Sequence, residues 1–416
     1  MFLLSRLLKS LVRKGALHII NADGSVHSFK GDEPGPEITI RFHDKRVAWD
    51  IARNPQLAVG EAYMDGRVTI ENGKDIRDFL DLALLNMGWE RVNHFNSPLS
   101  LWLKRLWGRI TQLNYASRAR RNVAHHYDLS GALYDLFLDR DRQYSCAYFR
   151  SDHDDLETAQ ANKKAHIAAK LLLKPGHKVL DIGCGWGGLG LYLNEVADVS
   201  VTGVTLSTEQ LEVARERARK AGVDGKVRFE LEDYRHVSGK FDRIVSVGMF
   251  EHVGAPNYGA FFRKCHDLLS DDGVALLHTI GRADGPGATN PWIRKYIFPG
   301  GYSPALSEIV PVIERAGFYI TDIEVLRLHY ARTLAAWYDR VQKNRDAIVA
   351  LYDERFLRMW EFYIAASQKT FEYSGHVVFQ IQFAKRQDQV PLTRDYIHEW
   401  ERAQEMKRVG RTVAAE

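Results

Sequence analysis

The sequence predicts an α/β fold, in which a doubly wound, mostly parallel sheet follows a small α+β amino-terminal domain. Helix and strand patterns alternate from about residue 155, which is typical of parallel strands joined by crossover helices. A glycine-rich turn at residues 183–188 directly follows the first buried strand, as at a ligand-binding strand end. The first hundred residues instead carry short alternating runs separated by Asp-Gly turns.

The length of 416 residues exceeds that of one ordinary domain, so we expect more than one. The predicted segments are an amino-terminal α+β domain (1–100), a basic linker (101–122), a doubly wound domain (123–390) and a charged, exposed tail (391–416).

The amino-terminal domain is predicted from runs in which apolar and polar residues alternate. These runs are Ala16–Ile20, Ile38–Phe42 and Val68–Glu71. Asp23-Gly24 and Asp65-Gly66 favour turns between them, and residues 74–87 have the apolar spacing of a helix.

The doubly wound domain is predicted to open with a helix that ends at Lys174-Pro175-Gly176. The predicted helices are Leu156–Leu173, Thr208–Ala221 and a long helical region, Thr333–Phe371. The predicted strands are Lys178–Ile182, Val199–Val204, Val227–Leu231, Phe241–Val247, Val274–Ile280, Tyr319–Leu328 and Val377–Phe383. Short connections between these elements favour a parallel sheet.

Positive charge is concentrated at the front of the chain. The formal net charge is +4, but residues 1–121 carry +6 and the remainder −2. Residues 1–15 combine apolar positions at helical spacing with basic residues and no acid, and residues 101–121 are basic with two tryptophans. We expect both segments to lie on an anionic membrane surface, although a surface helix docked on the protein core explains each equally well.

Composition excludes several classes of protein. Hydrophobic residues make up 45% and charged residues 26%, which excludes general disorder and fibrous repeats. No run approaches the ~18 apolar residues of a membrane-spanning helix. The three cysteines are scattered and form no CxxC pair, so we expect a cytoplasmic protein. We expect no nucleic-acid partner and no metal.

The stretch Asp181–Gly188, with the sequence DIGCGWGG, is the most informative in the chain. Its glycines let a ligand approach the backbone closely at the end of a strand. The stretch resembles motif I of the Rossmann-like class I S-adenosylmethionine-dependent methyltransferases. An acid before the glycines suits the cationic amino acid end of that cofactor better than it suits the pyrophosphate of a dinucleotide. The candidate cofactor residues here are Asp181, Gly183 and Gly185.

Two later strand ends add further cofactor candidates. Thr205, Leu206 and Ser207 follow the second strand, where this fold places its ribose contact and usually carries an acid. Gln210 lies just beyond them. A carboxylate after the third strand can accept a hydrogen bond from the adenine amino group. The candidates there are Asp233 and Tyr234.

Eight motifs, in order along the chain, resemble the cyclopropane-fatty-acyl-phospholipid synthases and the related mycolic acid cyclopropane synthases. They are His126–Leu129, Tyr144–Phe149, Asp181–Gly188, Thr205–Gln210, Phe250–Gly254, His278–Gly281, Tyr296–Gly301 and His329–Leu334. The front domain resembles the amino-terminal domain of the bacterial phospholipid-acting members.

The resemblance implies transfer of a methylene group from S-adenosylmethionine to a cis double bond of phospholipid acyl chains. It also implies a homodimer and a bicarbonate ion held in the active site. The residues that match the holders of this ion are Cys146, Glu251, His278, Tyr330 and the backbone of Ile280. Tyr144 and Ser145 match cofactor contacts.

The chemistry of such a reaction fits these residue types. An alkene that attacks the sulfonium methyl becomes a carbocation, and ring closure then requires loss of a proton from the transferred methyl. A small anion held by polar groups within apolar walls supplies the base and stabilises the cation. We expect the aromatic residues of Trp337–Phe371 to wall a tunnel for the acyl chain.

Other interpretations stay open on the sequence alone. The same residues suit a C-methyltransferase that makes methyl-branched or methylene fatty acids, or a lipid-binding protein without activity. Cys146 is equally typical of a plain core residue. A zinc site built from Cys146, Glu251 and His278 is disfavoured, because the three lie on separate elements. The favoured location is the inner face of the membrane.

Overall fold

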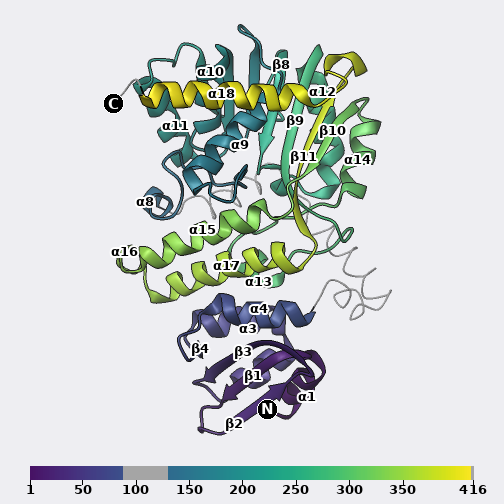
Figure 1. Cartoon of the computed structure of the whole chain (residues 1–416). Coiled ribbons are helices and arrows are strands. Elements are labelled where there is room, and N and C mark those ends of the chain that lie inside the picture. The colour runs from purple at the N-terminus through teal and green to yellow at the C-terminus, as the bar shows by residue number, and fades with distance from the viewer. Residues whose placement is uncertain (88–129, 414–416) are drawn as a thin grey trace. The chain divides into compact units, whose positions relative to one another are not determined.

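The computed structural model describes residues 1–87 and 130–413, with side chains as far as residue 407 (Figure 1). The chain divides into two compact units, each of which is described by itself. The expected basic linker and the motif His126–Leu129 lie outside the described residues. None of the described helices combines the length and the apolar character needed to cross a bilayer.

The described part of the first unit contains residues 1–87, 288–299 and 331–376, and its sheet has the order β2-β1-β3-β4. Its strands are β1 (Lys14–Ile20), β2 (Val26–Lys30), β3 (Glu33–Phe42) and β4 (Val68–Ile70). Its amino-terminal helices are α1 (Phe2–Leu11), α2 (Val47–Arg53), α3 (Pro55–Met64) and α4 (Ile76–Met87). Strand β1 is parallel to β3 and antiparallel to β2. The predicted small α+β region is therefore confirmed, and the sequence missed β2, α2 and α3.

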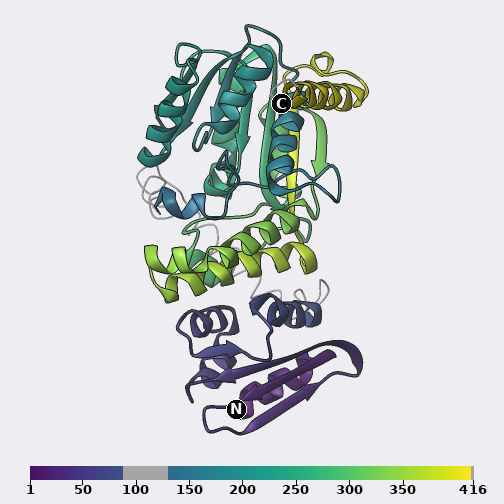
Figure 2. The ribbon, with the colours of Figure 1, turned by 60° about the vertical axis from the view of Figure 1, so that its left-hand side comes forward.

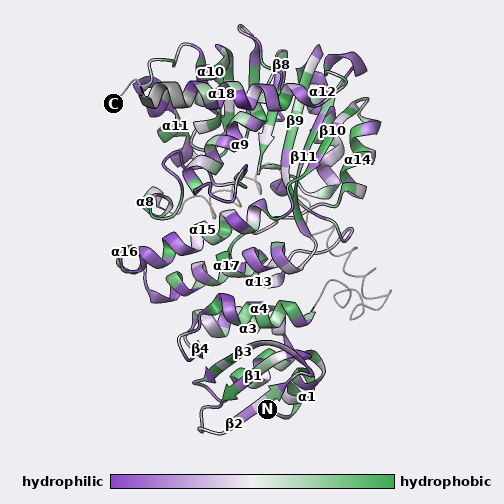
Figure 3. Ribbon diagram, in the orientation of Figure 1, coloured by the Kyte–Doolittle hydropathy of each residue, from purple (hydrophilic) through white to green (hydrophobic). Residues whose placement is uncertain are grey.

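Helix α1 divides its apolar residues between the core and the solvent. Leu4 and Leu8 are buried with Val12 in the core beneath the four-stranded sheet. Phe2 and Leu3 instead remain 81% and 51% exposed. Figure 3 shows hydrophobic and hydrophilic residues mixed along this helix. Docking on the protein core thus accounts for only one face of the predicted amphipathic segment.

Further helices of the first unit come from later in the chain. They are α13 (Pro291–Tyr296), α15 (His329–Lys343, which enters this unit at Ala331), α16 (Arg345–Leu351) and α17 (Glu354–Tyr373). Helix α13 packs on α3, α17 packs on α3 and α4, and α16 packs on α17. Helices α15 and α17 run alongside each other in Figures 1 and 2. Phe362 on α17 contacts the rings of Tyr63 and Trp292, at 6.2 and 4.7 Å between ring centroids. Aromatic residues expected to wall an acyl tunnel therefore contribute to the core of this unit.

The second unit contains a seven-stranded sheet with the order β10-β11-β9-β8-β5-β6-β7. Its strands are β5 (Lys178–Ile182), β6 (Ser200–Thr205), β7 (Val227–Leu231), β8 (Phe241–Val247), β9 (Leu269–Arg282), β10 (Tyr319–Val325) and β11 (His376–Ala384). Strands β5 to β9 pair in parallel, whereas β10 and β11 are antiparallel. Both the doubly wound fold class and every predicted strand of this sheet are confirmed.

Helices cover both faces of this sheet, and each face has its own buried cluster. Helices α9 (Leu156–Lys170), α10 (Gly188–Ala197) and α11 (Thr208–Lys220) pack on one face. Helices α12 (Tyr258–Leu268) and α14 (Leu306–Arg315) pack on the other. Short elements complete the unit: α8 (Gly131–Asp135) and the 3-10 turns η1 (Phe250–His252), η2 (Ala255–Asn257) and η3 (Gln387–Gln389).

The expectation of an exposed tail is wrong for part of the carboxyl-terminal segment. Residues Asp395–Val413 form the helix α18, which packs against α9 (Figure 1). Ile397 and Glu401 on this helix are each only 4% exposed. The charged composition concealed the helix, because one of its buried residues is itself an acid.

Candidate functional site

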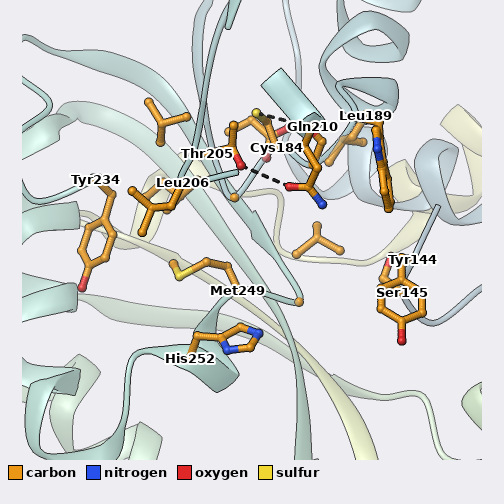
Figure 4. A pocket seen from close by; sticks show the side chains of 18 of the residues that line it. Tyr144, Ser145, Cys184, Leu189, Thr205, Leu206, Gln210, Tyr234, Met249 and His252 are labelled. Carbon is orange, nitrogen blue, oxygen red and sulfur yellow. Dashed lines mark hydrogen bonds between the residues drawn. The ribbon is translucent and has the colours of Figure 1, made fainter. Parts of the chain in front are cut away.

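The predicted cofactor residues meet around one cavity in the second unit, at the carboxyl ends of β5, β6, β7 and β8 (Figure 4). Parallel strands place these ends at a single edge of the sheet, where doubly wound folds bind ligands. Ten of the eleven predicted residues line the cavity: Tyr144, Ser145, Asp181, Gly183, Gly185, Thr205, Leu206, Gln210, Asp233 and Tyr234. Ser207 is buried instead at the start of α11, where its side chain accepts a hydrogen bond from the backbone of Gln210.

The glycine-rich turn brings the backbone into the cavity because it uses conformations that side chains disfavour. Gly183, Gly185 and Gly187 have φ values of +85°, +53° and +81°. A Cβ on Gly183 would lie only 2.7 Å from Cβ of Met249, whereas one on Gly185 would meet nothing within 4 Å. The turn therefore packs closely on one side and leaves open space beside Gly185.

Asp181 lies at the end of β5 and is buried, with 1% exposure. Burial raises its pKa to about 7, and a nearby positive charge on Lys163 partly opposes the rise. Its Oδ2 atom has no hydrogen-bond partner among the described residues. A buried acceptor without a partner is costly, so this carboxyl group is suited to a cationic or N–H-bearing ligand.

A short hydrogen-bond network shapes the wall after β6. Oγ1 of Thr205 donates to Oε1 of Gln210 at 3.2 Å and accepts from the backbone N–H of Ser207, also at 3.2 Å (Figure 4). This contact orients the Gln210 side chain and uses its Oε1 but not its amide nitrogen. Thr205 and Gln210, which follow β6 where this fold usually carries an acid, are thus held by hydrogen bonds within the protein.

The wall after β7 carries an acid that is already paired. Arg235 donates from Nε to Oδ1 of Asp233 at 2.8 Å and from a terminal nitrogen to Oδ2 at 2.5 Å. Burial opposes ionisation of Asp233, but these hydrogen bonds outweigh it and lower its pKa. Each carboxylate oxygen keeps a further lone pair, so Asp233 can still accept from an amino group.

Helix α9 holds the loop of residues 143–149, which carries three of the predicted site residues. Nε2 of Gln160 donates to the carbonyl oxygens of Gln143 and Ser145 at 3.1 and 3.0 Å. Nζ of Lys163 donates to Oε1 of Gln143 at 2.7 Å and to Oγ of Ser145 at 2.8 Å. Burial lowers the pKa of Lys163 to about 8. Tyr144 and Ser145 are therefore positioned by side chains from another element.

Aromatic rings enclose the side of the cavity next to this loop. Tyr134 contacts Tyr144 at 5.5 Å and Trp186 at 4.8 Å between ring centroids, both edge to face. Nε1 of Trp186 donates to a carboxylate oxygen of Glu209 at 3.0 Å. Aromatic faces attract cations, so this wall is compatible with a sulfonium group.

The structure joins two of the five predicted anion-binding residues directly. Oε1 of Glu251, on η1, accepts a hydrogen bond from the backbone N–H of Ile280 at 2.6 Å. Its other oxygen, Oε2, is buried without a hydrogen-bond partner among the described residues. Burial raises the pKa of Glu251 to about 7. Oε2 of Glu251 can therefore accept a hydrogen bond from a group in the space beside it.

The other three predicted anion-binding residues are buried on separate elements. His278 on β9 is 2% exposed, and its Nδ1 lies 3.1 Å from Nε2 of Gln380. Burial lowers its pKa to about 3, so the ring is neutral. Cys146 is 1% exposed and its thiol donates to the carbonyl of Ala147 at 3.3 Å, while Tyr330 is 7% exposed.

Two of these five residues adjoin the cofactor cavity in sequence, although none of the five lines it. Cys146 follows Ser145 and Glu251 precedes His252, and Ser145 and His252 both line the cavity. In the described part of the chain, no group of three or more His, Cys, Asp or Glu could hold a metal ion.

Sequence reasoning missed several residues of the cavity. Met249 and His252 follow β8, so the strand-end rule that selected Thr205 also applied to them. Burial lowers the pKa of His252 to about 4. Lys163 had no local signal, because only the folded chain brings α9 beside the loop.

Comparison with known proteins gives two family matches. A family described as mycolic acid cyclopropane synthetase matches residues 114–381, and a domain of unknown function matches residues 3–88.

Individual relatives cover most of the chain. The cyclopropane-fatty-acyl-phospholipid synthase of Escherichia coli is 40% identical over 80% of this chain and 85% of its own length. A probable fatty acid methyltransferase of Pseudomonas putida is 35% identical over 87% and 92%. The crystal structure of the mycolic acid cyclopropane synthase CmaA1 with SAH and CTAB has a TM-score of 0.60 and 35% identity, covering 64% of this chain and 97% of that one.

Proposed function

Because the chain belongs to the mycolic acid cyclopropane synthetase family and is an S-adenosylmethionine-dependent methyltransferase, we propose that it transfers a methylene group to unsaturated phospholipids. The acceptor is the cis double bond of an acyl chain, and the product is a cyclopropane fatty acid. The Escherichia coli relative, with its phospholipid-acting name, supports the choice of lipid. The long alkyl chain of CTAB in the CmaA1 structure is compatible with an acyl site in the same family.

The single observation that carries the proposal is the environment of Glu251. This acid is buried, receives a backbone hydrogen bond at one oxygen and leaves the other unmet. The large majority of buried side-chain oxygens have a hydrogen-bond partner. The unmet oxygen suits a small hydrogen-bonding group in a dry pocket, and a bicarbonate ion, whose O–H can donate, fits that requirement.

The chain's residues would hold that ion from several sides. Glu251 would accept a hydrogen bond from its O–H, and His278 and the backbone of Ile280 would orient its polar edge. Cys146 and Tyr330 would complete the cradle. When bound there, bicarbonate supplies a base for the proton that the transferred methyl must lose.

At the cofactor end, the chain's task is to bind and to orient. Asp181 faces the cationic amino acid end, Thr205 and Gln210 face the ribose, and Asp233 with Tyr234 faces the adenine. Tyr144 and Trp186 exclude water from the sulfonium. The alkene forms its new bond to the methyl carbon while the carbon–sulfur bond breaks, so the electron pair leaves on sulfur. Positioning of the two reactants accounts for much of the acceleration.

A second product class shares these steps up to the cation. The Pseudomonas putida relative is called a probable fatty acid methyltransferase, and this name favours methyl-branched or methylene products as the alternative. A cradle with all five residues present favours ring closure, since it offers a base beside the methyl.

We further propose that the enzyme is cytoplasmic, works at an anionic membrane surface and forms a homodimer. The exposed pair Phe2 and Leu3 supports the membrane contact, because they lie beside the basic residues Arg6 and Lys9 on α1. The domain boundaries at residues 100, 122 and 390 stay predictions.

The direct test is incubation with S-adenosylmethionine and liposomes of monounsaturated phospholipid. Mass spectrometry of the fatty acids should show a gain of one CH₂, and proton NMR should show high-field ring protons. Vinylidene or branched-methyl signals would instead establish the alternative. No gain of mass in any monounsaturated lipid would refute both.

A further inference from the structure

The carboxyl-terminal helix contributes a buried acid to a region beside the cofactor loop. Glu401 on α18 accepts from Nδ1 of His166 at 2.7 Å, and its side chain is only 3% exposed. On the other side of the ring, Nε2 of His166 lies 2.7 Å from Oε2 of Glu324 on β10. Neither the cofactor cavity nor the predicted anion cradle includes any of these three residues.

The two contacts hold the ring of His166 from both sides, at Nδ1 and at Nε2. An ionised carboxylate only accepts hydrogen bonds, so a ring nitrogen that bonds one is the donor. Hydrogen bonds from this ring contribute to the lowered pKa values of Glu324 and Glu401, although burial opposes ionisation of both acids.

Stacked rings connect His166 to the loop of residues 143–149. Tyr148 stacks on His166 with 4.2 Å between ring centroids and 11° between the planes. Tyr148 also stacks on His329, at 5.0 Å and 14°. Nδ1 of His329 accepts from the backbone N–H of Phe149 at 3.0 Å, and His329 immediately precedes Tyr330.

We propose that Glu401 on α18, acting through the His166 and Tyr148 rings, positions the loop that carries Tyr144, Ser145 and Cys146. Glu401 and His166 are positioning residues, since neither lies on the cavity wall. The inference rests on the proposed cofactor and anion sites, because these give the loop its importance. It assigns to the carboxyl-terminal helix a part in catalysis.

Several charged groups face this assembly, and they balance one another. Lys170 contacts Glu324 and lies 3.5 Å from Asp322, which is also paired with Arg394. Burial lowers the pKa of His278, and the charges of Lys163, Lys170 and His166 lower it further. The groups that face His166 or its acids are Glu324, Glu401, Lys170, Tyr148, Asp322, Arg394, His398, Arg150 and His278.

The test compares Glu401→Gln with Glu405→Gln in the full chain. Glu405 lies one turn further along α18 and pairs with Arg150 at 2.9 Å, but it is half exposed, so it controls for loss of a helix carboxylate. We expect Glu401→Gln to raise the KM for S-adenosylmethionine or lower kcat by about tenfold or more, since a misplaced loop weakens alignment. Glu405→Gln should change neither.

A comparison per folded molecule separates positioning from general damage. The folded fraction of each variant is measured by circular dichroism, because a partly unfolded preparation has fewer active molecules but an unchanged KM. A KM for S-adenosylmethionine and a kcat per folded molecule that both equal those of the wild type would overturn the inference.

A second variant covers the case in which Glu401→Gln fails to fold. Tyr148→Leu removes the stack and leaves the charges, and it should reduce kcat/KM, whereas Tyr148→Phe keeps the stack and should restore it. Equal effects of the two would overturn the inference. Calorimetric binding of SAH by the wild type distinguishes this result from failure of the proposed function, because an absence of binding would refute the cofactor site itself.

Discussion

Replacing Glu251 by Gln should lower kcat, and it should change the free energy of unfolding by an amount that depends on pH. Burial raises the pKa of Glu251 from 4.5 to about 7. The folded state therefore holds a proton that the unfolded state has released between these two values. Such a group stabilises the fold fully below pH 4.5, and the contribution is lost as pH rises through 7.

The magnitude follows from the shift. A difference of one pKa unit corresponds to about 1.4 kcal/mol, so between pH 5 and pH 8 the wild type should lose about 2.5 kcal/mol through this group. Gln at position 251 does not titrate, so the free energy of unfolding of the variant does not fall with pH through this group. A buried amide group takes the place of the unpaired Oε2, and this lowers the free energy of unfolding by about 1–3 kcal/mol at every pH. Only the change between the two pH values isolates the buried charge.

Equilibrium unfolding in urea at pH 5 and pH 8 measures the effect. The free energy of unfolding of Glu251→Gln relative to wild type should rise by about 2.5 kcal/mol from the lower to the higher pH. Glu399→Gln, on the exposed face of α18, is the matched control and should show no such rise. A difference for Glu251→Gln that is equal at both pH values would refute a buried titrating acid.

The activity of the same variant completes the prediction. We expect kcat at pH 8 to fall by about 10²-fold, the usual loss when one electrostatic contact to a transition state is removed. Binding of SAH should remain within a factor of about 2–3, because Glu251 does not line the cofactor cavity. Loss of SAH binding would contradict the role given to this residue.

Three further outcomes test the rest of the site and the front domain. Gly183→Ala should destabilise the protein and weaken SAH binding in calorimetry much more than Gly176→Ala; both have a φ near +85°, but only the first brings a Cβ to 2.7 Å from another side chain. Phe2→Ser with Leu3→Ser should reduce sedimentation with anionic liposomes at an unchanged melting temperature, and undiminished sedimentation would exclude α1 as the anchor. Lys163→Met should raise the KM for S-adenosylmethionine about tenfold, and an unchanged KM would show that the loop keeps its place without the two hydrogen bonds.

Local rules were sufficient to predict the doubly wound sheet and one side of its site. Apolar runs bounded by turns identify strands such as β5 and β8, whose bounds agree with the prediction residue for residue. Because parallel strands end at one edge, residues at their ends meet without further information. Asp181, Thr205 and Asp233 are brought together by this rule. Strand β2 was not predicted, because apolar and polar residues alternate only weakly in its sequence, VHSFK.

The same rules fail wherever a buried charge is neutralised by a distant partner. Lys163, His166 and Glu401 look like solvated helix residues in the sequence, because charged side chains are rarely buried unless paired. The pair His166 and Glu401 is separated by 235 positions. Nothing in a local pattern states that such a partner exists.

Two of the buried ionisable residues on α9, Lys163 and His166, nevertheless share one target, the loop of residues 143–149. Lys163 bonds the loop directly, and His166 reaches it through a stacked ring. Removal of a buried charge's partner is far costlier than loss of an exposed pair, so each anchor resists displacement. In the proposed reaction the loop holds a sulfonium and a small anion in line, and such a loop gains more from rigidity than from added affinity. Lys163 and His166, which sequence patterns could not predict, thus hold the loop that carries the predicted site residues.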